Sequence, residues 1–125
     1  MLNDVPIHAT LPCANFERAK AFYADKLGLT PTSEQPAGAF YAVGGGTRFF
    51  LFPSSGAASG SHTQMGFSVP DIDAAVRDLK ARGVTFEEYD FPSFDKATST
   101  AQTGPVRSAW FKDTEGNLLG LVQLS

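Results

Sequence analysis

The chain has 125 residues, which suits one compact domain with a shared core. Apolar residues make up 42% of the chain, which excludes a disordered acidic chain. The formal net charge is −3 and there is no basic stretch, which argues against nucleic acid or an anionic membrane as a partner. Cys13 is the only cysteine, no apolar run nears the ~20 residues that span a bilayer, and the N-terminus has no signal-peptide pattern, so we expect a cytoplasmic protein.

The first part of the chain predicts a strand, a helix and three further strands. Asn15 is a suitable N-cap for a helix over 15–27, and Gly28 is a suitable C-terminal cap. Alternation of apolar and polar residues, with a glycine-rich turn between the last two segments, predicts the strands. These strands are expected at 5–12, 30–36, 40–43 and 48–52.

The same order of elements returns after a small, flexible stretch at 54–61. Asp71 is a suitable cap for a second helix over 71–82, and it lies 56 positions after Asn15. The polar, proline-bounded stretch 92–105 predicts a long mobile loop that could close over a ligand. Strands are expected at 64–69, 85–89, 106–111 and 118–124.

This repetition predicts an internal duplication within a single domain of residues 1–125. Module one is expected at about 4–53, the linker at 54–61, and module two at about 62–125. One unit alone cannot bury both faces of its sheet, whereas two units can share a curved sheet surface.

Three stretches resemble the vicinal oxygen chelate superfamily, which includes glyoxalase I, extradiol dioxygenases and bleomycin resistance proteins. They are NFERAKAFYADKLGL at 15–29, FSVPDIDAAVRDLKARGV at 67–84 and AWFKDTEGNLLGLVQ at 109–123. The resemblance implies an α+β fold in which two βαβββ modules form a curved mixed β-sheet cleft with helices on the outside. It also implies a homodimer.

Relatives of this kind hold a divalent metal in the cleft through side chains of the first and fourth strands of each module. The resemblance places these positions at His8, Gln64, Phe50 and Gly120. Phenylalanine and glycine donate no ligand, and divalent cations require three or four donors. We therefore expect no metal and no other cofactor, with His8 and Gln64 as the only matching ligand positions.

The register and the resemblance together predict a ligand pocket in the cleft. Arg107 is interpreted either as an anion clamp or as a solvated edge charge, and Trp110 either as a packed strand residue or as a stacking surface. His8 is the best candidate for a general base, although a hydrogen-bonding role is open as well. The predicted pocket residues are His8, Thr10, Phe50, Phe52, Gln64, Gly66, Arg107, Trp110 and Gly120.

The favoured function is therefore a glyoxalase/bleomycin-resistance-like protein that binds a small, largely apolar or aromatic molecule between the modules without the usual metal. One alternative is a metal-dependent lyase, isomerase or dioxygenase of the same superfamily. A second alternative is a metal-free enzyme in which His8 acts as the general base. The residues are compatible with a binding protein and with an enzyme.

Overall fold

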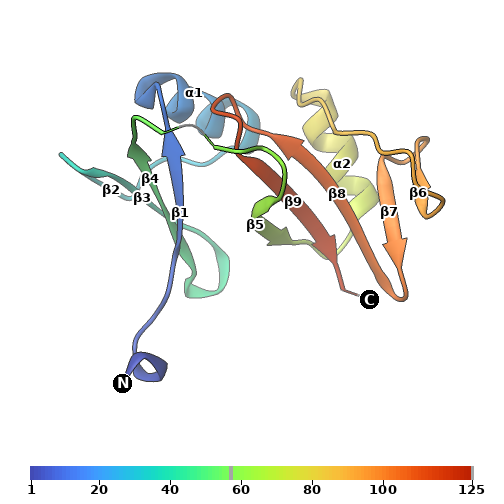
Figure 1. The fold of residues 1–125 in the computed structure, drawn as a ribbon, viewed down its shortest axis with the longest axis horizontal. Coiled ribbons are helices and arrows are strands. Elements are labelled where there is room, and N and C mark those ends of the chain that lie inside the picture. The colour runs from blue at the N-terminus through green and yellow to red at the C-terminus, as the bar shows by residue number, and fades with distance from the viewer. Residues whose placement is uncertain (57, 125) are drawn as a thin grey trace.

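The computed structural model describes residues 1–56 and 58–124, and it contains two mixed sheets with one α-helix packed on each. Figure 1 shows the two sheets side by side, with β1 and β5 as neighbouring strands. Ala57 of the predicted linker and Ser125 of predicted module two lie outside the described residues. Neither helix combines the length and the apolar character that crossing a membrane requires.

Module one forms a four-stranded sheet in the order β1-β4-β3-β2. Strand β1 runs parallel to β4, and the other pairs are antiparallel. A short 3-10 turn, Gly44–Gly46, makes the connection of the predicted glycine-rich hairpin. The strands are β1 (Ala9–Cys13), β2 (Ser33–Gln35), β3 (Gly38–Ala42) and β4 (Arg48–Pro53).

Module two repeats this arrangement with one additional short strand, in the order β5-β9-β8-β7-β6. Strand β5 runs parallel to β9, as β1 does to β4. The repetition confirms the predicted fold of two modules. The strands are β5 (Thr63–Ser68), β6 (Phe94–Asp95), β7 (Thr100–Thr103), β8 (Val106–Lys112) and β9 (Leu118–Gln123).

Each helix covers one face of its own sheet. Helix α1 (Phe16–Leu27) begins at the Asn15 cap, whose side chain accepts a hydrogen bond from the backbone N–H of Arg18, and helix α2 (Ile72–Ala81) begins at Asp71 in the same way. Beneath α1 the Tyr23 ring packs against Phe49, which is 2% exposed. Strand alternation therefore leaves every second residue on the opposite face, which no helix of the described residues covers.

The turn between β8 and β9 fastens module two to the start of α1. The Glu115 carboxylate accepts hydrogen bonds from the backbone N–H groups of Ala14 and Asn15, each at 2.9 Å, and from Arg18 Nε at 2.8 Å. An anion at a helix N-terminus satisfies free N–H groups and opposes the helix dipole. Glu115 thus holds module two against the first turn of the module-one helix.

A second contact of this turn is buried. The Tyr23 hydroxyl donates a 2.8 Å hydrogen bond to Oδ2 of Asp113, and Asn117 Nδ2 donates to Asp113 Oδ2 and to the Pro12 carbonyl. Asp113 also accepts from the backbone N–H of Glu115 and Asn117 within its own turn. The turn DTEGN at 113–117 therefore links the two modules through buried hydrogen bonds.

The structure differs from the predicted elements in three places. Strand β1 begins at Ala9, and a 3-10 turn (Leu2–Asp4) followed by an extended segment precedes it (Figure 1). The strand predicted at 85–89 is reduced to one bridge between Phe86 and Phe111. The prediction of a long loop at 92–105 is wrong, because β6 and β7 occupy it and β7 pairs with β8.

Candidate functional site

The uncovered face of module one is aromatic. Phe40 on β3 and Phe50 on β4 are cross-strand partners with ring centroids 4.6 Å apart. Phe52 follows two positions after Phe50, and their rings are 6.2 Å apart and inclined by only 13°. All three side chains are half-buried, whereas Phe49 on the other side is covered. We call Phe40, Phe50 and Phe52 the aromatic face.

Two nitrogen-bearing side chains border the aromatic face. The His8 ring lies edge-on to Phe40 at 5.2 Å, and the Arg48 guanidinium lies over the same ring at 4.3 Å. Thr10 pairs with Phe50 across the β1–β4 ladder. Sequence reasoning did not single out Phe40 and Arg48. The alternation within β4 and the register of the β3–β4 hairpin were the signals that could have found them.

Module two presents a separate aromatic group around Trp110. The indole Nε1 donates a 3.0 Å hydrogen bond to Thr63 Oγ1, and Tyr89 packs edge-on against the indole with ring centroids 5.4 Å apart. Gly120 is the cross-strand partner of both Trp110 and Gly66. This stretch of β9 therefore has no side chain between the indole and β5.

Gln64 occupies an irregular position in β5. The pairing with β9 shifts between Thr63 and Met65, so Gln64 has no partner of its own in the ladder. Its Oε1 atom is buried without a hydrogen-bond partner among the described residues. A buried acceptor without a hydrogen-bond donor lowers the stability of the fold, and a ligand that donates a hydrogen bond to it would remove this loss.

Arg107 lies on the helix side of module two. Its guanidinium donates two hydrogen bonds to the Asp73 carboxylate of α2, at 2.8 and 2.9 Å, and one to Thr100 Oγ1 at 3.0 Å. The hydrogen bonds from Arg107 lower the pKa of Asp73 and raise that of Arg107 itself. The structure thus places Arg107 in an ion pair with α2 and does not bring it to the aromatic face.

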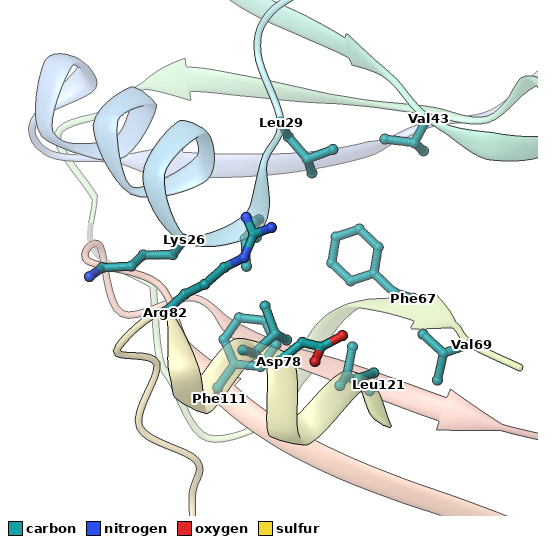
Figure 2. Close-up of a pocket in the computed structure, with 12 residues that line it drawn as sticks. Lys26, Leu29, Val43, Phe67, Val69, Asp78, Arg82, Phe111 and Leu121 are labelled. Atoms are coloured by element: carbon teal, nitrogen blue, oxygen red, sulfur yellow. The ribbon is translucent and has the colours of Figure 1, made fainter. Parts of the chain in front are cut away.

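Two adjoining cavities lie between the modules. One, of about 410 Å³, lies between the β3–β4 turn and β5, and Arg48 and Gly66 are part of its wall. The other, of about 330 Å³, lies on the helix side, where Leu29 and Val43 of module one face Phe67 and Leu121 of module two (Figure 2). Both walls include Val43 and Phe67, so the cavities meet there.

The charged rim of the helix-side cavity has a structural explanation. Arg82 extends from the end of α2 toward Gly28, the C-terminal cap of α1, and Lys26 of α1 extends toward Gly83 after α2. Each cation therefore lies near the C-terminus of the other helix, where the helix dipole favours positive charge.

The residues at the four family ligand positions do not suit a divalent metal. Phe50 contributes an aromatic ring, Gly120 contributes no side chain, and Gln64 lies in the irregular part of β5. His8 is left as the single imidazole donor, next to Phe40. Within residues 1–56 and 58–124 no three His, Cys, Asp or Glu side chains are grouped so that they could hold an ion.

Comparison with known proteins gives the same fold. An uncharacterized protein, YurT, from Bacillus subtilis (strain 168) is 30% identical over 123 residues, covering 86% of this chain and 89% of its own. The crystal structure of UcmS2 matches with a TM-score of 0.73 and 20% identity, over 94% of this chain and 96% of that one. TnmS3, an antibiotic binding protein from Streptomyces sp. CB03234, matches with a TM-score of 0.68 and 27% identity, over 97% and 98% of the chains.

The sequence comparison extends over almost the whole chain. The model of the Glyoxalase/Bleomycin resistance protein/Dioxygenase superfamily matches residues 6–121. These residues include both helices, the aromatic face and the β8–β9 turn that joins the modules. On this evidence the chain belongs to the Glyoxalase/Bleomycin resistance protein/Dioxygenase superfamily.

Proposed function

We propose that the chain binds a flat, largely apolar small molecule on the aromatic face and that it does so without a metal. The observation that carries this proposal is the half-buried state of Phe40, Phe50 and Phe52, which no helix of the described residues covers. Contiguous aromatic surface of this kind on a folded domain marks a binding site for a ligand or partner.

The neighbouring groups support the same function. His8 and Thr10 supply hydrogen-bonding groups beside the rings. In the structure of TnmS3, which is described as an antibiotic binding protein, the same fold occurs at 27% identity. A sequestering or resistance function therefore fits this chain better than catalysis at a metal.

We further propose that the protein is a homodimer. The extended segment before β1 leads away from both sheets (Figure 1), and Ile7 on it is 90% exposed. Val5 on the same segment and Leu2 in the 3-10 turn before it are also exposed. Exposed apolar side chains of this kind are stabilised by packing on a second copy. Light scattering at micromolar concentration should give twice the monomer mass, and a monomer would contradict the proposal.

The test of the binding function is a screen of flat aromatic compounds against the wild type and Phe50→Glu. The substitution places a charge in the middle of the aromatic face, so every compound bound there should lose affinity at least tenfold. Gln102→Glu on β7 introduces the same charge elsewhere and serves as the control.

Two outcomes would overturn the proposal. If Phe50→Glu leaves the affinity of every bound compound unchanged, the aromatic face is not the site. If the wild type turns over a glutathione hemithioacetal or a catechol when a divalent metal is added, the protein is a metal-dependent enzyme and not a binding protein.

A further inference from the structure

We infer that the ligand of the aromatic face carries an acidic group and that Arg48 is the residue that selects it. This inference rests on the proposed function, because it concerns the same site. It identifies the ligand class as a planar aromatic compound with a phenolate, carboxylate or sulfonate.

The argument begins with the position of the Arg48 guanidinium. Its centre lies 4.3 Å from the centroid of the Phe40 ring, which holds one face of the planar group against the sheet. No carboxylate of the described residues forms an ion pair with it. A guanidinium fixed in this way keeps its N–H edge available, and that edge matches the oxygens of an anion.

Three of the four carboxylates of module one pair with other cations, and the fourth, Asp25, lies on α1. Glu17 and Glu34 both pair with Lys20 on α1, at 3.0 Å each, on the helix side of the sheet. Asp4 pairs with the N-terminal amine of Met1. The border of the aromatic face thus carries Arg48 and His8, and an acidic ligand group has a favourable electrostatic environment there despite the net charge of −3.

The rings beside Arg48 determine the rest of the ligand. Phe50 follows Arg48 by two positions on the same face, and the nearly parallel rings of Phe50 and Phe52 continue along the strand. A fused aromatic system lying over Phe50 can therefore place an acidic substituent at the guanidinium edge. Arg107 cannot bind the acidic substituent without losing its two hydrogen bonds to Asp73.

A matched pair of fluorescent probes tests the inference. 8-Anilinonaphthalene-1-sulfonate and N-phenyl-1-naphthylamine share the same aromatic body, and only the first carries a sulfonate. Arg48→Gln should weaken sulfonate binding about tenfold, as expected for the loss of one charge-assisted contact, and leave the neutral probe within about twofold. Arg48→Lys keeps the charge but not the planar fork, so its affinity for the sulfonate should lie between wild type and Arg48→Gln.

Two further variants separate the possible failures. Phe50→Ala should weaken both probes, because it removes the shared stacking surface, and Arg107→Gln should weaken neither. If Phe50→Ala weakens both probes while Arg48→Gln changes neither, or if Arg107→Gln alone weakens the sulfonate, the inference about Arg48 is wrong and the binding function stands. If Phe50→Ala leaves both probes unchanged, the proposed binding function itself fails.

Discussion

The contact between Glu115 and the start of α1 predicts a measurable, pH-dependent loss of stability. Glu115→Gln keeps the shape of the side chain but removes the charge that faces Arg18 and the helix N-terminus. The Glu115 side chain is 0% exposed, and the hydrogen bond from Arg18 is the main cause that lowers its pKa from 4.5 to about 2. This shift corresponds to ~3 kcal/mol, and because the Arg18 side chain is 52% exposed we expect a loss of ~2 kcal/mol at pH 7.

The sign of the pH dependence follows from the lowered pKa. A carboxylate whose pKa is lower in the folded state contributes its full stability above pH 4.5, the ordinary value. That contribution is lost as the pH falls from 4.5 to about 2, where folded Glu115 takes up a proton. The difference in unfolding free energy between wild type and Glu115→Gln should therefore be constant between pH 6 and 8 and shrink below pH 4.5.

Urea unfolding at a series of pH values measures this difference, with tryptophan fluorescence or circular dichroism as the signal. Glu17→Gln is the control, since Glu17 is also in the first turn of α1 but is 78% exposed, so its loss should stay below ~0.5 kcal/mol. A Glu115→Gln variant within ~0.5 kcal/mol of wild type at pH 7, or a difference that does not shrink at acid pH, would refute the reasoning.

Three further predictions follow from the core. Tyr23→Phe should lower the unfolding free energy by ~1–2 kcal/mol in urea, because Asp113 loses a buried donor; an unchanged value would show that the bond contributes nothing. Gly38→Ala should lower the unfolding free energy by more than ~3 kcal/mol or prevent folding, because the φ of Gly38 is +153° and the new Cβ would meet a backbone carbonyl. The control Gly104→Ala, at φ +60° in open space, should lower it by only ~1 kcal/mol. Burial raises the pKa of Cys13 to about 11, so thiol reagents at pH 8 should label it only at the rate of unfolding, and rapid labelling of the native protein would contradict its buried position.

The helices could be predicted from the sequence because their signals are local. Asn15 and Asp71 cap helices that the structure places at Phe16–Leu27 and Ile72–Ala81, within one residue of the predicted ends. The β3–β4 and β8–β9 hairpins were predictable for the same reason, since their turns contain glycines where the backbone must reverse.

The segment 92–105 shows where local signals fail. Its polar composition predicted a loop, yet Ser99 and Thr100 are buried. Their hydroxyls are satisfied by Lys80 of α2 and by Arg107 of β8, and β7 takes its backbone hydrogen bonds from β8. Partners contributed by other elements make polar residues compatible with burial, and composition alone does not reveal them.

Residue types and spacing were enough to predict the two-module architecture, whereas the expectation that Phe50 and Gly120 stand at two of the family ligand positions came from the resemblance. Which arginine is available to a ligand was decided only by the tertiary structure. Arg107 and Arg48 both lie on strands, but α2 brings Asp73 to Arg107, whereas the β3–β4 register brings the Phe40 ring beneath Arg48. A carboxylate neutralises a guanidinium, whereas an aromatic ring orients it and leaves its N–H edge open, and only the packing of elements distant in sequence sets which of the two each arginine meets.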